Sequence, residues 1–313
     1  MSIMGVVMKK KLFFVFNPHA GKAAIRSKLL DVVDVFVKGG FEVQVHPTQE
    51  RKDAVRQVKD ACAWADLIVC CGGDGTMDEA VEGFMEAEKK VPIGYIPAGS
   101  TNDFASSLQI SRDMTIAAQQ IVDGEVRHVD IGTFNDDYFV YVAAFGAFTE
   151  VSYATDQQLK NSMGYLAYVL QGAKEIFDLK SYKMKFTSDV DVYEGEFIYG
   201  MVTNSKSVGG MKNVTGKNVE LNDGYFEVTL IHTPKNALEL AEIVGCLMSQ
   251  EDTSNLIDTF KTQKLTVESE EEVSWTLDGE FGGSVKDVVI ENQKQALPLI
   301  LAPTKEKDIP LLG

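Results

Sequence analysis

Residues 67–84 contain glycine and polar residues in an order that is typical of a phosphate-binding turn. The stretch LIVCCGGDGTMDEAVEGF opens with five apolar, β-prone residues, which predict a buried strand of a parallel sheet. Gly72, Gly73 and Gly75 permit backbone torsions that a sharp turn needs, and Thr76 opens a segment with apolar residues at helical spacing. Such a turn leaves N–H groups unpaired at the positive end of a helix dipole. The pattern therefore predicts a phosphate-binding turn between a strand and a helix.

Two other predicted strands end in small and polar residues. NPHAGK occupies residues 17–22, and IPAGSTNDFA occupies residues 96–105. Ligands of parallel sheets gather at the carboxyl ends of the strands, so the three loops predict one binding edge. A P-loop is disfavoured because Gly21-Lys22 is followed by alanine, and the G-x-G-x-x-G dinucleotide fingerprint is missing.

The elements that position these loops change in character near residue 128. Strands and helices alternate from residue 11 to about 126, which predicts a parallel sheet covered by helices. Beyond residue 127, short strands with Gly, Asn and Asp turns predict an antiparallel sandwich or a barrel-like half. Helices are expected over 157–179 and 236–250. We expect domains at 1–128 and 129–296, with a C-terminal strand at about 297–313 returning to the first.

Composition narrows the function. The chain of 313 residues carries 30 Lys and Arg against 46 Asp and Glu, a formal charge of −16, so the global field does not favour nucleic acid or an anionic bilayer. The four cysteines form no CxxC pair and predict reduced thiols in a cytoplasmic protein. No apolar run has the length of a membrane span, so a lipid substrate would require transient binding to the membrane surface. The basic cluster KSYKMK at 180–185 is interpreted as solvated surface.

Five segments together carry a resemblance. NPHAGK, GGDGTMDEAVEGF, IPAGSTNDFA, LNDGYFEV and TLDGE resemble, in order and across almost the whole chain, the diacylglycerol kinase catalytic-domain family, and most closely its soluble bacterial lipid kinases. GGDGT is shared with NAD kinases and phosphofructokinases, whereas NDFA followed far downstream by DGY and LDGE is more specific. The resemblance implies an N-terminal α/β nucleotide-binding domain, NAD kinase-like or phosphofructokinase-like, followed by a β-sandwich domain with a cleft between them.

The resemblance also implies which residues bind the nucleotide. They belong to the three loops and to a threonine at the end of the second strand: Asn17, Pro18, His19, Ala20, Gly21, Thr48, Gly72, Gly73, Asp74, Gly75, Thr76, Met77, Asp78, Ser100, Thr101 and Asn102. In the third loop the family usually has Gly-Thr, and Ser100 fills that threonine position here. Whether Ser100 or Thr101 makes the contact stays open. On its own, Asn102 is equally well interpreted as a helix cap.

Metal binding and proton transfer are assigned in the same way. By resemblance, Asp223 is a metal ligand, with the backbone carbonyls of Glu220 and Tyr225 completing the site. Asp74 is expected in the catalytic metal and water network, because a carboxylate beside phosphates requires a cation between them. By resemblance, Glu280 is the better candidate for the base, with Asp278 supporting it. As alternate residues, the two are expected to point to one side of a strand end. The structural alternatives are a hairpin turn at 222–224 and a polar strand face at 278–280.

The resemblance thus implies an ATP- and Mg²⁺-dependent lipid kinase that phosphorylates a lipid hydroxyl, with diacylglycerol to phosphatidic acid as the first expectation. An NAD kinase-like soluble kinase and a non-catalytic lipid or nucleotide sensor are the alternatives. The expected partner is a lipid at the membrane surface, without a transmembrane segment and without nucleic acid. The lipid itself and the oligomeric state, including a homodimer, stay open.

Overall fold

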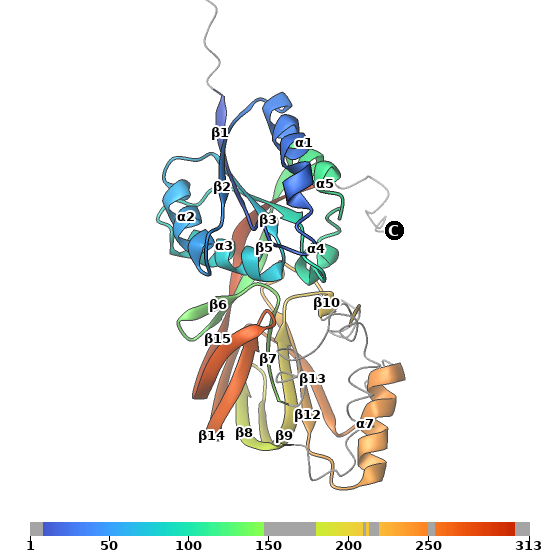
Figure 1. Cartoon of the computed structure of the whole chain (residues 1–313). Helices are drawn as coiled ribbons and strands as arrows, with labels where there is room; N and C mark the ends of the chain where they lie inside the picture. The colour runs from blue at the N-terminus through green and yellow to red at the C-terminus, as the bar shows by residue number, and fades with distance from the viewer. Residues whose placement is uncertain (1–8, 147–179, 209–210, 213–218, 250–253, 304–313) are drawn as a thin grey trace, which may run out of the picture. The chain divides into compact units, whose positions relative to one another are not determined.

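The computed structural model describes residues 9–146, 180–208, 211–212, 219–249 and 254–303, and the helix expected over 157–179 lies outside them (Figure 1). The chain forms two compact units. Unit 1 comprises the described residues of 1–128 and 297–313, and unit 2 those of 129–296. Both helices and strands occur, so the fold is mixed α/β. Among the described residues, no helix is long and apolar enough to cross a bilayer.

Unit 1 is a parallel sheet covered on both faces by helices. Its strands lie in the order β15 (its C-terminal end), β4, β3, β1, β2. Helices α1 and α5 pack on one face of the sheet, and α2 and α3 pair with each other on the opposite side (Figure 1). Burial on both faces explains why every residue of β3 is buried. The elements in chain order are β1 (Lys10–Phe16), α1 (Ile25–Lys38), β2 (Phe41–Pro47), α2 (Asp53–Cys62), β3 (Leu67–Gly72), α3 (Asp74–Glu86), β4 (Ile93–Pro97), α4 (Asp103–Ser107) and α5 (Met114–Val122).

The turn after β3 differs from the expectation in two respects. Helix α3 begins at Asp74 rather than at Thr76, because the N–H groups of Thr76 and Met77 both donate to the Gly73 carbonyl. In addition, neither Gly72 nor Gly73 adopts a positive φ. Their lack of a side chain serves close packing instead. A Cβ on Gly72 would lie 2.4 Å from the Thr76 Cβ, and one on Gly73 would lie 3.3 Å from the Gly99 Cα.

Unit 2 is built mainly from an antiparallel sheet. Its central order is β13, β12, β9, β7, β14, β15; β8 also joins β9 to β14, and β5 joins β15 to β6. Phe139 of β6 contacts Phe226 of β12 with ring centroids 5.4 Å apart, so the sheet curves round its main core. A second, smaller cluster lies between the sheet and α7. The elements are β5 (Glu125–Phe134), β6 (Asp137–Phe139), β7 (Val142–Gly146), β8 (Tyr182–Ser188), β9 (Val192–Thr203), β10 (Ser207–Val208), β11 (Met211–Lys212), β12 (Phe226–His232), α7 (Ala237–Ser249), β13 (Ile257–Thr262), β14 (Lys264–Leu277) and β15 (Glu280–Leu301).

Long strands replace several short predicted ones. Residues 264–268 and 273–277 belong to one strand, β14, whose pairing with β15 shifts between Glu268 and Val273. Likewise 285–291 and the apolar tail form the single strand β15, and Leu299 of β15 pairs in parallel with Ile93. The expectation of separate short strands was wrong for β14 because an irregularity in its pairing interrupts the alternation without ending the strand. It was wrong for β15 because this strand continues from its pairing with β14 to its pairing with β4.

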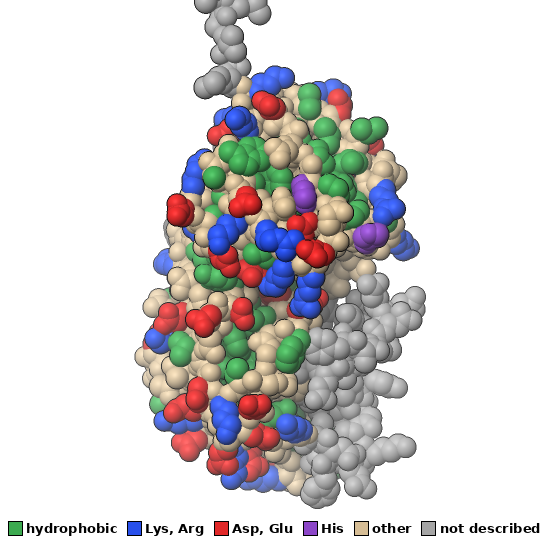
Figure 2. Space-filling model, turned by 60° about the vertical axis from the view of Figure 1, so that its left-hand side comes forward, with side chains coloured by type: hydrophobic (Ala, Val, Ile, Leu, Met, Phe, Trp, Pro, Cys, Tyr) green, Lys and Arg blue, Asp and Glu red, His purple; other side chains and the backbone are tan. Residues whose placement is uncertain are grey.

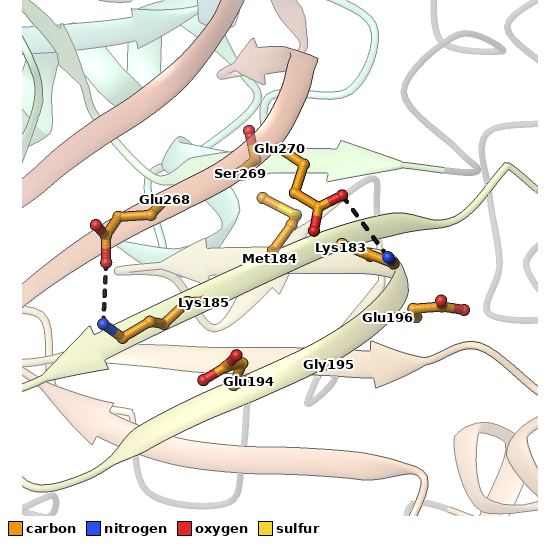
Figure 3. Close-up of a pocket in the computed structure, with 9 residues that line it drawn as sticks. All are labelled: Lys183, Met184, Lys185, Glu194, Gly195, Glu196, Glu268, Ser269 and Glu270. Atoms are coloured by element: carbon orange, nitrogen blue, oxygen red, sulfur yellow. Dashed lines mark ion pairs between the residues drawn. The ribbon is translucent and has the colours of Figure 1, made fainter.

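Most of the basic cluster at 180–185 belongs to strand β8, which was not predicted from the sequence. In β8, Tyr182 and Met184 are buried while Lys183 and Lys185 are exposed, as the alternation of a half-buried strand requires. Lys183 and Lys185 form ion pairs with Glu270 (3.7 Å) and Glu268 (3.2 Å). These side chains line a hollow of about 480 Å³ over β8, β9 and β14 (Figure 3). The lysines are therefore surface residues, as predicted, but the strand that carries them was not predicted.

Candidate active site

The loops after β1, β2, β3 and β4 lie side by side at one edge of the unit 1 sheet. Backbone hydrogen bonds join them: Asn17 N–H donates to Cys71 O (2.9 Å), Thr48 N–H to Phe16 O (2.9 Å) and Ala98 N–H to Gly72 O (2.7 Å). The parallel register of the strands produces this arrangement. The structure thus brings together the four segments that carry the predicted nucleotide-binding residues.

The first loop is tied to the start of α3. Asn17 donates from Nδ2 to Thr76 Oγ1 (3.4 Å), and its Oδ1 accepts the His19 N–H (2.9 Å). Gly21 has φ +55°, and a Cβ there would lie 2.4 Å from the Ala98 carbonyl oxygen. Glycine is therefore required at this position both by its torsion and by the closeness of the neighbouring loop. Pro18 is partly buried and Ala20 is buried.

The first turn of α3 presents a limited set of groups. The N–H groups of Asp74 and Gly75 precede the first intrahelical hydrogen bonds, which leaves them available to a phosphate. The Thr76 and Met77 N–H groups are used within the helix, and the Met77 side chain is buried in the core. Asp78 lies partly exposed on the same helix. Only part of the predicted set is therefore positioned for direct contact.

Asp74 is the most unusual group at this edge. Its Oδ2 accepts the Asp103 N–H (3.3 Å), whereas its buried Oδ1 has no hydrogen-bond partner. Burial, and then the nearby charge of Asp103, raise the pKa of Asp74 to about 6. A buried carboxylate oxygen without a donor, beside a second carboxylate, suits a hard cation. Asp103 was not selected from sequence, although it lies in the NDFA segment that carried the resemblance.

The third loop is closed by Asn102. This buried residue has left-handed torsions (φ 54°, ψ 53°), its Oδ1 accepts the Gly99 N–H (2.9 Å), and its Nδ2 donates to the Gly99 carbonyl (2.7 Å). The amide thus serves the loop's own backbone. Ser100 is exposed, whereas Thr101 is partly buried and its carbonyl accepts a hydrogen bond from Arg112 (3.0 Å). Ser100 is therefore the more accessible of the two hydroxyls.

Gly99→Ala is expected to lower the free energy of unfolding by about 1–3 kcal/mol and to weaken ATP binding. The new Cβ would lie 2.5 Å from the Gly73 Cα and 2.8 Å from the Asn102 Oδ1, so the backbone of one loop must move. Urea unfolding and calorimetric ATP titration measure both effects. Gly245→Ala, exposed in α7 with no atom within 4 Å of its Cβ, is the matched control and should be neutral or slightly stabilising. Equal behaviour of the two variants would contradict the packing argument.

Asp53 holds the Thr48 loop. This buried carboxylate accepts the Gln49 N–H (2.9 Å) and contacts His46 Nε2 (2.9 Å), with Arg56 at 3.2 Å. Burial alone would raise the pKa of Asp53, but the hydrogen bonds from His46 and Gln49 outweigh burial and hold it below its usual value. Asp53 therefore fixes the backbone on both sides of Thr48.

Asp53→Asn is expected to destabilise the protein by about 1–3 kcal/mol at neutral pH, with the difference vanishing in acid. A lowered folded-state pKa adds stability above the unfolded value of 3.8, and this stability is lost as pH falls through the folded pKa. Unfolding in urea at pH 7 and pH 3, on the wild type and the variant, measures the effect. Asp60→Asn, exposed on the same helix, serves as the control. A cost that persists undiminished at pH 3 would refute the assignment.

In unit 2, Asp278 and Glu280 do not lie on one side of a strand. Asp278 and Gly279, both with positive φ, form the two-residue turn between β14 and β15, and Glu280 pairs with Leu277. Asp278 is buried, and its carboxylate accepts the N–H groups of three consecutive residues, 140–142, at 2.5, 2.9 and 2.9 Å. Glu280 is exposed. The expectation that both point to one side was wrong because the Asp-Gly turn ends the alternation.

The turn that contains Asp223 is held by the carboxylate of Asp130, a residue that was not among the predicted site residues. Asp130 is fully buried; its Oδ2 accepts the Gly224 N–H (2.7 Å) and its Oδ1 the Gln295 N–H (2.7 Å). Its own N–H donates to Leu221 O (2.8 Å). Gly224 has φ +89°, which a tight turn of this kind requires. Asp130 therefore positions the turn that presents Asp223.

Asp223 is already engaged by neighbouring groups. Its Oδ1 accepts the Tyr225 N–H (2.9 Å), and its Oδ2 lies 3.1 Å from the Lys261 Nζ. Lys261 also pairs with Glu227 at 3.0 Å. Burial raises the pKa of Glu227 to about 7, against the opposing effect of Lys261. Glu220 and Tyr225 are exposed. In the part of the chain that is described, no cluster of three or more His, Cys, Asp or Glu side chains could hold a metal ion.

Comparison with known proteins shows which family this chain resembles. The family model of the diacylglycerol kinase catalytic domain matches residues 11–134. The diacylglycerol kinase of Bacillus subtilis (strain 168) is 32% identical over 276 residues, 88% of this chain and 91% of that protein. That of Staphylococcus carnosus (strain TM300) is 31% identical over 280 residues, 89% and 91% of the two chains. A solved structure of a candidate diacylglycerol kinase from Bacillus anthracis str. Sterne superposes with a TM-score of 0.81 at 26% identity, covering 94% and 98%.

The similarities extend through both units, and the phosphate-suited loops lie inside the segment that matches the family model. They define the class of the protein, an enzyme of the lipid kinase type. The chain belongs to the diacylglycerol kinase family, as the sequence resemblance indicated. As a member of a kinase family it uses ATP.

Proposed function

We propose that the protein transfers the γ-phosphate of ATP to a lipid hydroxyl in a Mg²⁺-dependent reaction, with diacylglycerol as acceptor and phosphatidic acid as product. The observation that carries the proposal is the Asp74 carboxylate at the start of α3. It lies beside Asp103, and its buried Oδ1 has no hydrogen-bond donor. The relatives named diacylglycerol kinase support the choice of acceptor. The finer description of the two units, a NAD kinase-like or phosphofructokinase-like domain and a β-sandwich, is part of this proposal.

Unit 1 supplies the nucleotide site in this proposal. The free N–H groups of Asp74 and Gly75, near the positive end of α3, bind phosphate oxygens, and Asn17 orients the first loop against Thr76. A bound Mg²⁺ supplies charge neutralisation on the phosphates. Asp74 and Asp103 would be the side chains that hold it, because the buried Asp74 Oδ1 has no other compensating partner. The hydroxyl of Ser100 is the more accessible of the two in the third loop.

Unit 2 supplies the base. Glu280 is exposed at the first residue of β15, directly after a turn fixed by the buried Asp278. The Glu280 carboxylate takes the proton of the lipid hydroxyl as the oxygen bonds to the γ-phosphorus and the bond to ADP breaks. Asp278 keeps Glu280 in place through the backbone of residues 140–142 and does not itself take the proton, because its oxygens are occupied by N–H donors.

The lipid is reached at the membrane surface. We propose transient, peripheral association of a cytoplasmic protein. Figure 2 shows acidic and basic side chains interspersed on the face in view, without a large area of one sign. With a net charge of −16, binding to acidic lipids is expected to need cations. Sedimentation with anionic vesicles in a chelator tests this, and tight binding under those conditions would contradict it. A homodimer is an open alternative that analytical ultracentrifugation resolves.

The decisive experiment is transfer of label from ATP, with Mg²⁺, to mixed micelles that carry diacylglycerol, phosphatidylglycerol, a sphingoid base or no lipid. NAD serves as a soluble control. Label in the organic phase with diacylglycerol supports the proposal, and label with another lipid alone corrects the acceptor. Label only on NAD would favour the NAD kinase-like alternative. ATP binding without any transfer would favour a non-catalytic sensor.

A further inference from the structure

A lysine lies at the position where the family resemblance predicts a metal ion. Asp223 is in the turn before β12, Glu227 is on β12, and Lys261 is on β13. The Lys261 Nζ is 3.1 Å from Asp223 Oδ2 and 3.0 Å from Glu227 Oε1. The two carboxylate side chains are mostly buried, at 22% and 9% exposure. The ammonium donates a hydrogen bond to Asp223, whereas its contact with Glu227 is an ion pair, because neither buried Glu227 oxygen has a hydrogen-bond partner. One ammonium group therefore compensates the charge of two sheltered carboxylates.

The strand register positions Glu227 and Lys261 for this contact. Glu227 and Lys261 are direct cross-strand partners in the antiparallel pair of β12 and β13, so their side chains share one face of the sheet. The buried Asp130 fixes the turn through the Gly224 N–H, which sets where Asp223 points. Three separate parts of the chain thus converge on one cation position, and that cation is supplied by the protein.

The predicted metal site does not fit this arrangement. Both Asp223 oxygens are already engaged, because Oδ1 accepts the Tyr225 N–H and Oδ2 faces the Lys261 ammonium. A metal ion at Oδ2 would have to displace the lysine. A Mg²⁺ bound at about 2.1 Å from that oxygen would lie close to the Lys261 charge. Like charges at such separations repel strongly in a partly buried site. Either the lysine or a divalent cation can occupy the position.

We propose that the Lys261 ammonium takes the place of a metal ion at the Asp223 turn, so that this turn is held by an internal cation and binds no Mg²⁺. Lys261 neutralises Asp223 and Glu227 and joins β13 to the turn, which is the structural task that a bound cation would perform. Any requirement of the protein for divalent cations then arises elsewhere. The inference concerns cation binding and stability, and it does not depend on which lipid is phosphorylated.

The test measures cation binding without nucleotide in an Asp74→Asn background, which leaves Asp103 as the only carboxylate of the other proposed metal site. In this background, calorimetric Mg²⁺ titration is expected to detect no saturable site. Lys261→Met should create one, and its unfolding temperature should fall in a chelator and recover in millimolar Mg²⁺. Lys264→Met, which removes an exposed lysine paired with Glu291, is the matched control and should show no recovery.

Two results would overturn the proposal. One is saturable Mg²⁺ binding with Lys261 intact that disappears in Asp223→Asn, because the turn would then be a metal site despite the lysine. The other is a folded Lys261→Met protein that gains no Mg²⁺ binding, because the carboxylates would then form no cation position at all. If Lys261→Met does not fold in a chelator, folding restored by Mg²⁺ supports the inference. In that case Mg²⁺ titration of the protein with Lys261 intact, compared with Asp223→Asn, still shows whether the turn is a metal site.

Discussion

Asp74→Asn is expected to lower phosphoryl transfer by about a hundredfold or more while the unfolding temperature stays the same or rises. Removing one preorganised electrostatic group from a site of this kind costs about that factor. Stability should not suffer, because the partly exposed carboxylate lies beside Asp103, its buried Oδ1 has no donor, and its pKa is raised to about 6. Asparagine has almost the same shape and removes a buried charge. Initial rates with labelled ATP and thermal unfolding measure the two effects.

The control for this variant is Asp34→Asn, an exposed change on α1 that touches none of the loops and should alter neither quantity. A clear fall in unfolding temperature in Asp74→Asn would show that the carboxylate serves the fold instead of the reaction. Normal turnover would remove Asp74 from the machinery altogether. In either case the assignment of unit 1 as the nucleotide site would have to rest on the backbone N–H groups alone.

The largest stability effect is expected for Asp278→Ala, about 3–5 kcal/mol in the free energy of unfolding. The substitution leaves the N–H groups of residues 140–142 without their acceptor in a buried place, and each unsatisfied donor carries a desolvation cost of about 1–3 kcal/mol. Local rearrangement reduces the sum. Urea unfolding measures the loss. Asp278→Asn, which keeps one carbonyl oxygen as acceptor, should lie between the variant and the wild type.

Glu280→Gln is the matched contrast to this variant, two residues along the chain. Glu280 is exposed, so its replacement should leave the free energy of unfolding within about 0.5 kcal/mol of the wild type. Transfer to the lipid should nevertheless be lost, because glutamine does not accept a proton. Full activity in Glu280→Gln would exclude it as the base. A stable, inactive Asp278→Ala protein would reverse the two roles.

Much of the fold is encoded in local patterns. The alternation of strands and helices before residue 128, and the change to mainly consecutive strands after it, follow from hydrophobic periodicity, which each segment carries by itself. The glycine turn, the polar strand ends and the family are likewise apparent in the linear order of the loops. Even here the glycines act differently from the expectation, since Gly72 and Gly73 permit close packing and not positive φ. Strand β8 was missed because its lysines were interpreted only as a basic surface cluster, although their alternation with buried residues is typical of a half-buried strand.

The residues at the site needed the tertiary structure, because their partners are distant in the chain. Asp74 meets Asp103, Asp278 meets residues 140–142, and Lys261 meets Asp223 only through the pairing and register of strands. A sequence pattern reports the period of one segment, whereas register depends on the packing of several segments at once. The sequence by itself therefore determined most of the elements, their order and the chemical types at the loops. The tertiary structure decided which carboxylate lacks a donor, which is satisfied by backbone, and which is neutralised by a lysine.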